Sequence, residues 1–138
     1  MGTVRLRGTA DRVIARIAVS EPVPYAVRID GRRASLVLYR SYSDTDWLRY
    51  GRADPFLQAA DWFQPASDRY TLHLDFARPP WGYDVRYESG ALVLEVRKPP
   101  EIDPDRPLSG RTIAIDPGHP PAGATGPTRL YEGDANLA

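Results

Sequence analysis

The sequence predicts a mainly β protein, with a two-fold repeated antiparallel β-sandwich over residues 3–98, a linker over residues 99–109 and the first strand of an α/β domain over residues 110–138. Three observations support this prediction. Apolar and polar residues alternate with period two in several segments, which is typical of strands with one buried face and one wet face. The pattern occurs twice. Short turn sequences separate the alternating segments.

Two copies of the alternating pattern cover about residues 3–40 and 60–98. The dipeptide Asp11-Arg12 recurs as Asp68-Arg69, and the apolar positions around it recur with it. The matched apolar positions are Val13, Ala15, Ile17 and Val19 in the first copy and Tyr70, Leu72, Leu74 and Phe76 in the second. We expect each half to contain four strands and the two halves to pack face to face as a small sandwich.

Turn and breaker residues divide the halves further. Asp30-Gly31 and Ser89-Gly90 predict hairpin turns before strands at residues 36–39 and 92–96. One helix is expected over residues 54–60, because Asp54 can cap a helix and Pro55 suits its first position. Residues 99–109 are proline-rich and charged, which is typical of a semi-rigid linker.

The last segment contains a candidate metal site. Residues 112–115 favour a buried strand, and the turn after it would present His119 at the carboxyl end of that strand. Glu132, at the expected start of a helix, could supply a second ligand, since catalytic zinc binds a few His, Asp or Glu side chains and keeps one position for water. The alternative is a Pro-Gly turn with an incidental histidine, and a solvated carboxylate at a helix start.

The motifs Ile115-Asp-Pro-Gly-His119 and Tyr131-Glu-Gly-Asp-Ala-Asn-Leu137 resemble the opening of the catalytic domain of zinc-dependent N-acetylmuramoyl-L-alanine amidases. These enzymes cut the amide between muramic acid and the first alanine of the peptidoglycan stem peptide. The resemblance implies zinc as cofactor, with His119 and Glu132 as ligands. The family's third ligand, a histidine, and its catalytic glutamate would lie beyond residue 138, so we expect this chain alone to be inactive and to bind zinc weakly or not at all. Pro120-Pro121 departs from the family's usual Gly-Gly.

The two-fold β pattern, which ends in Gly90-Ala-Leu-Val-Leu-Glu-Val96, resembles the AMIN domain found at the N-terminus of such amidases and in some secretins. This second resemblance covers residues 3–98. It implies that the β module targets the cell envelope and binds peptidoglycan. It also implies an extracytoplasmic location, in the periplasm or cell envelope.

Two segments, residues 39–52 and 78–83, gather aromatic and arginine side chains that could contact glycan or protein. Sugar rings stack on aromatic faces, and arginine binds carboxylates with paired N–H groups. The alternative is structural: Trp47 and Leu48 would close the open end of the sandwich, and Trp81 would be a core or corner residue. His73 is expected to be a surface histidine. The candidate contact residues are Tyr39, Arg40, Tyr42, Trp47, Arg49, Tyr50, Arg52 and Trp81.

Composition restricts the partners further. The net charge is zero, but residues 1–53 hold ten arginines against five acidic residues. A basic half can face an anionic wall polymer, whereas a duplex-binding domain normally has a stronger basic balance and an identifiable reading element. We therefore expect peptidoglycan as a partner, no nucleic acid and no membrane span. The alternative function is a non-catalytic module that contacts another envelope protein through residues 39–52.

Overall fold

The computed structural model describes residues 2–43, 48–51 and 53–114, and the single residues 125, 127 and 129. The chain divides into two compact units, Met1–Glu101 and Ile102–Ala138. Within the described residues there are nine strands and no helix. The predicted mainly β class is therefore confirmed for this part of the chain.

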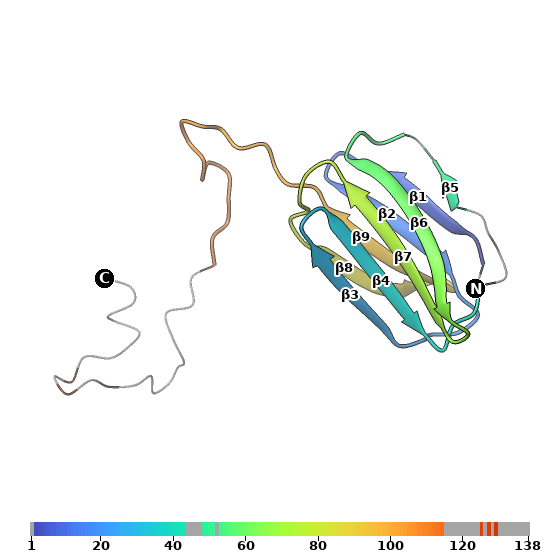
Figure 1. Cartoon of the computed structure of the whole chain (residues 1–138). Coiled ribbons are helices and arrows are strands. Elements are labelled where there is room, and N and C mark those ends of the chain that lie inside the picture. The colour runs from blue at the N-terminus through green and yellow to red at the C-terminus, as the bar shows by residue number, and fades with distance from the viewer. Residues whose placement is uncertain are drawn as a thin grey trace. The chain divides into compact units, whose positions relative to one another are not determined.

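All nine strands belong to the first unit and form two sheets stacked as layers (Figure 1). Every neighbouring pair is antiparallel except β1 and β5, which are parallel. Sheet A has the order β5-β1-β2-β9-β8, with β1 Val4–Gly8, β2 Arg12–Ala18, β5 Leu48–Tyr50, β8 Tyr83–Glu88 and β9 Ala91–Arg97. Sheet B has the order β3-β4-β7-β6, with β3 Tyr25–Asp30, β4 Arg33–Tyr39, β6 Leu57–Ala66 and β7 Arg69–Phe76.

The two sequence halves are interleaved and do not form one sheet each. The first half contributes β1 and β2 to sheet A and β3 and β4 to sheet B, while the second contributes β8 and β9 to sheet A and β6 and β7 to sheet B. The halves meet inside each sheet, where β2 pairs with β9 and β4 pairs with β7. The duplication itself stays a prediction. Alternation could not indicate this arrangement, because it shows which side of a strand is buried but not which strand lies beside it.

The alternating positions form the core between the sheets. Val13, Ala15 and Ile17 of β2 are fully buried, as are Leu72 and Leu74 of β7. Aromatic rings complete the packing: the centroids of Phe56 and Phe76 lie 4.9 Å apart and those of Trp62 and Tyr70 lie 5.4 Å apart, both pairs stacked. The predicted buried faces of these two strands are therefore confirmed.

Both predicted hairpin turns are present. Gly31, between β3 and β4, has a φ of 55°. Between β8 and β9, Ser89 and Gly90 have φ values of 46° and 69°, the left-handed conformation that two-residue hairpin loops require. Glycine adopts this conformation at little steric cost, which is why the sequence signal was reliable here.

The helix predicted over residues 54–60 is wrong. Asp54 Oδ1 accepts a hydrogen bond from Phe56 N at 2.9 Å, and Asp54 O accepts one from Leu57 N at 3.1 Å, so the capping residue begins a single turn. Strand β6 then starts at Leu57 and pairs with β7. Sheet pairing and the packing of Trp62 against the core outweigh the local helical signal, because such propensities are weak beside tertiary contacts.

The second unit contains turns over its described residues. Ser109 N donates to Arg106 O at 3.0 Å, and Arg111 N donates to Leu108 O at 3.1 Å. The strand predicted over residues 112–115 is not formed at 112–114, where Ile113 is exposed. A strand needs a neighbour to satisfy its backbone groups, and the described part of this unit supplies none.

Candidate functional site

The candidate contact residues do not converge on one site. Tyr39 ends β4 in sheet B, whereas Arg49 and Tyr50 belong to β5 in sheet A. Trp81 precedes β8 and lines a separate hollow. Four predicted residues lie outside the described part of the chain: the metal ligands His119 and Glu132, and the contact residues Trp47 and Arg52.

The residues around the end of β4 are held by local contacts. The Arg69 guanidinium lies over the Tyr39 ring, 5.6 Å from its centroid. Arg40 has a φ of 53°, a left-handed conformation that turns the chain out of the strand. Ser41 is buried and its backbone N donates to Asp68 O at 3.0 Å, whereas Tyr42 is exposed. Tyr42 is thus presented to solvent from an anchored segment.

Strand β5 closes one edge of the sandwich. Leu48 packs against the core, as the structural alternative for this segment predicts. The hydroxyl of Tyr50 donates to Ala60 O of β6 at 3.2 Å, so Tyr50 bridges the edge strands of the two sheets. Arg49 lies between them in the chain and is exposed on the outer face of sheet A.

His73 lies on the outer face of sheet B. Its ring packs edge-on against Phe63, with centroids 5.0 Å apart, and its Nδ1 lies 3.9 Å from Asp61 Oδ1. Across the described residues, no group of three or more His, Cys, Asp or Glu side chains could hold a metal ion. His73 is therefore a packed, partly exposed histidine in this structure.

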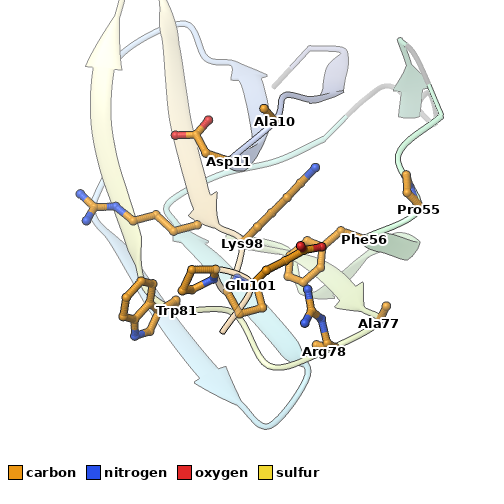
Figure 2. A pocket seen from close by; sticks show the side chains of 12 residues that line it. Ala10, Asp11, Pro55, Phe56, Ala77, Arg78, Trp81, Lys98 and Glu101 are labelled. Carbon is orange, nitrogen blue, oxygen red and sulfur yellow. The ribbon is translucent and has the colours of Figure 1, made fainter. Parts of the chain in front are cut away.

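The most developed candidate site is a hollow of about 700 Å³ at the end of the sandwich where β9 leads out. Figure 2 shows the side chains that line it. Trp81 contributes an indole that is 61% exposed. The lining comes from four segments of the chain and consists of Ala10, Asp11, Pro55, Phe56, Ala77, Arg78, Trp81, Arg97, Lys98, Pro99, Pro100 and Glu101.

Backbone hydrogen bonds fix Trp81 beside the end of β9. Trp81 N donates to Arg97 O at 2.9 Å, and Arg97 N donates to Gly82 O at 2.8 Å. Gly82 has a φ of 136°, which side chains rarely tolerate, so glycine suits this approach to the strand. The indole therefore sits on a rigid support.

A buried ion pair holds Lys98, one of the residues that line this hollow. Lys98 Nζ lies 2.7 Å from Asp54 Oδ2 and donates to Thr9 O at 2.6 Å; the side chains of Lys98 and Asp54 are 17% and 8% exposed. Gly8 leaves room for this pair, because a Cβ there would lie 1.7 Å from Asp54 Oδ2. Lys98 is thus committed to the fold and is not a cation that a ligand could use.

The remaining charged residues that line the hollow are Asp11, Arg78, Arg97 and Glu101. Hydrogen bonds from Arg12 and Thr9 lower the pKa of Asp11 to about 2, so this carboxylate stays ionised and paired with Arg12. Arg78 and Arg97 are exposed, and no carboxylate of the described residues lies within ion-pair distance of either. The hollow thus combines a largely exposed indole with the guanidinium groups of Arg78 and Arg97, and Glu101 adds a carboxylate to its lining.

Sequence reasoning chose Trp81 within the segment of residues 78–83 but did not include Arg78 or Arg97 among the contact residues. Arg78 begins that segment and could have been included as a contact residue on proximity alone. Arg97 ends β9, and its position beside Trp81 depends on the pairing of the chain around Gly82, which no local signal showed.

The chain matches no protein-family model, no curated protein and no solved structure. None of its described residues forms a helix long and apolar enough to cross a membrane.

Proposed function

We propose that this chain is the N-terminal part of a zinc-dependent N-acetylmuramoyl-L-alanine amidase, in which the AMIN-like β-sandwich binds peptidoglycan and keeps the amidase domain at the wall in the periplasm or cell envelope. The sequence motifs around His119 and Glu132 support the amidase part of the proposal. The hollow beside Trp81 supports the binding part, and it is the observation on which wall binding depends.

The chemistry of the hollow suits a glycan that carries peptide carboxylates. An exposed indole offers a flat apolar face on which a sugar ring can stack. Arg78 and Arg97 can each hold a stem-peptide carboxylate through paired N–H groups. One ligand can therefore use both kinds of contact at once.

The position of the hollow also fits a tethering role. Pro99, Pro100 and Glu101 line it, and the chain continues from them into residues 102–138. A domain tethered to a bound module meets its polymer at a raised effective concentration. Binding here would keep the following domain close to its substrate whatever the angle between the two.

Zinc is proposed as the cofactor of the full-length parent protein. His119 and Glu132 would be its first two protein ligands, and a bound zinc ion would polarise the scissile carbonyl and acidify a water. In the family, a further histidine ligand and a catalytic glutamate complete the site. Hydrolysis is thus proposed for the parent, and wall binding for this chain.

The binding proposal is tested by co-sedimentation with purified peptidoglycan sacculi. We expect residues 1–138 to sediment with the sacculi and Trp81→Ala to weaken binding about tenfold, as loss of an aromatic stacking contact predicts. Phe63→Ala, which removes another exposed aromatic on sheet B, is the matched control and should bind normally. Failure of the wild type to sediment would favour the alternative module that contacts an envelope protein through residues 39–52.

Zinc titration by calorimetry separates the amidase part from the binding part. Two ligands from an otherwise incomplete site must bear the cost of ordering the chain, so we expect weak binding that His119→Ala abolishes. If the chain binds no zinc but its sedimentation still depends on Trp81, the wall-binding part of the proposal stands and the metal site loses its support.

A further inference from the structure

Arginines form a row across the outer face of sheet A. Arg49 of β5 lies opposite Arg5 of β1, and Arg5 lies opposite Arg16 of β2. Neighbouring strands are about 4.8 Å apart, so three cationic side chains stand side by side. Arg7, two residues along β1 from Arg5, points to the same face.

These four arginines surround a hollow of about 730 Å³. Ile14 and Tyr50 give it an apolar portion, and Gly8 and Gly51 also line it. It shares no lining residue with the hollow beside Trp81. Whatever binds in one site therefore need not contact the other.

The charges of this row are not balanced as they are elsewhere on the sheet. Arg16 is the exception, since its Nη2 donates to the backbone oxygens of Glu88 and Ser89 at 3.1 Å and its Nη1 forms an ion pair with Glu88 Oε1 at 3.7 Å. Among the described residues, however, no carboxylate lies within ion-pair distance of Arg5, Arg7 or Arg49. Like charges directly opposite one another destabilise a sheet, so the row carries a cost that a purely structural role does not offset.

We propose that this hollow binds the phosphate groups of a flexible, base-free phosphate polymer. A phosphate presents several oxygens in a tetrahedral arrangement and can accept hydrogen bonds from guanidinium groups on two adjacent strands. The row continues over three strands and so can take successive phosphates of one chain. Ile14 and Tyr50 can contact the atoms between the phosphates.

Other anionic partners fit less well. Single-stranded nucleic acid binds on aromatic stacking platforms, and Tyr50 is the one aromatic residue among those that line this hollow. Acidic peptides present isolated carboxylates, which do not require guanidinium groups in adjacent register.

The test is binding of inorganic polyphosphate to the 1–138 chain, followed by fluorescence anisotropy with a labelled polymer at low and near-physiological salt. We expect Arg5→Gln/Arg49→Gln to weaken binding by about tenfold or more, because two direct charge contacts are lost. The matched control, Arg28→Gln/Arg32→Gln, removes two exposed charges from the region of β3 and its turn and should change affinity less than about twofold. Thermal melts of all variants check that each is folded.

A second variant separates fork geometry from charge. Arg5→Lys/Arg49→Lys keeps the charge but loses the paired donors, so its affinity should lie between those of the wild type and the glutamine variant. Equal losses in the Arg28/Arg32 control would overturn the site in favour of general charge attraction. Equal or tighter binding of polyglutamate, single-stranded DNA or phosphatidylglycerol vesicles would overturn the ligand class.

A substitution in this site should not affect the wall-binding site, and a substitution there should not affect this one. Trp81→Ala should leave polyphosphate binding unchanged, and Arg5→Gln/Arg49→Gln should leave sedimentation with sacculi unchanged. If one double or single substitution abolishes both activities in a folded protein, the two sites are not separate and this proposal is overturned.

Discussion

Arginines near β9 and arginines near β1, at opposite ends of sheet A, differ in whether a carboxylate binds them. We call these two regions the β9 side and the β1 side. On the β9 side, Arg12 and Arg86 both bind Glu95, with closest N–O distances of 2.6 and 2.7 Å. On the β1 side, Arg5 and Arg49 lie opposite each other with no described carboxylate at ion-pair distance. The same residue type therefore serves the fold on one side and is left available on the other.

The β9 side shows what structural arginines look like. All residues of β9 from Ala91 to Val96 are buried, although alternate ones face outwards. Long arginine side chains can cover apolar surface with their methylene groups while the charged ends reach a carboxylate or water. Val93 lies on this outer face between Arg16 of β2 and Arg86 of β8. An arginine that lacks such a carboxylate is the better candidate for a ligand contact.

The largest loss of stability is expected at the ion pair of Lys98 and Asp54, which is more buried than the arginine pairs of Glu95 on sheet A. Asp54→Ala should lower the free energy of unfolding by about 3 kcal/mol, because it leaves the Lys98 ammonium without its carboxylate. Urea denaturation measures this. Asp30→Ala is the control: its pair with Arg28 is about 80% exposed on both sides, so we expect a loss below about 0.5 kcal/mol. Equal losses in the two variants would mean that burial does not determine how much these pairs contribute to the free energy of unfolding.

The β9 side is tested directly by Glu95→Ala. The carboxylate is 10% exposed and accepts charged hydrogen bonds from two arginines, so its loss should cost about 2 kcal/mol of unfolding free energy. Asp84→Ala, on the neighbouring strand with a 3.6 Å contact to Arg86, should cost less than about 0.5 kcal/mol. A Glu95 variant as stable as the wild type would remove the distinction between the two sides.

The same carboxylate predicts a pH dependence. Arg86, and then Arg12, hold the pKa of Glu95 below its ordinary value of 4.5. Because the folded pKa is the lower one, this stabilisation is fully present above about pH 4.5 and is lost as the pH falls through the folded pKa. The stability advantage of the wild type over Glu95→Gln should therefore shrink in denaturation curves below pH 4.5. An advantage that stays constant down to pH 2 would contradict this linkage.

The smallest effect is expected on the β1 side. Arg5→Ala and Arg49→Ala should each change the unfolding free energy by no more than about 0.5 kcal/mol, with a tendency to stabilise, because each removes one of two facing like charges. Thermal and urea unfolding would measure it. A loss above about 1 kcal/mol in either variant would show that these arginines hold the fold together and weaken the case for a ligand there.

The sequence predicted the features that depend on local chemistry. The glycines at positions 31 and 90 mark turns that few other residues can make, and alternation identified the buried side of β2 and β7. It did not predict the interleaving of the halves, because any strand with the right buried side can pair with any other. The signals at Asp54 and Pro55 were real but belong to a turn as much as to a helix.

The candidate sites show the same division. Trp81 could be chosen from the sequence, because aromatic and arginine residues gather around it, but its exposure came only from the structure. The row of Arg49, Arg5 and Arg16 could not, because it depends on parallel pairing of the short strand β5 with β1. The uneven charge of residues 1–53 indicated a basic surface without showing where its members meet.

The interleaved halves have a consequence for synthesis. Arg12 of β2 pairs with Arg97 of β9, so β2 gains its second neighbour only when the last of the nine described strands has been made. While a ribosome makes the intervening residues, β2 and β4 each lack one neighbour and present bare backbone edges. Folding dominated by such distant pairings is slow, so the nascent first half needs to be kept from pairing with other chains until β9 emerges.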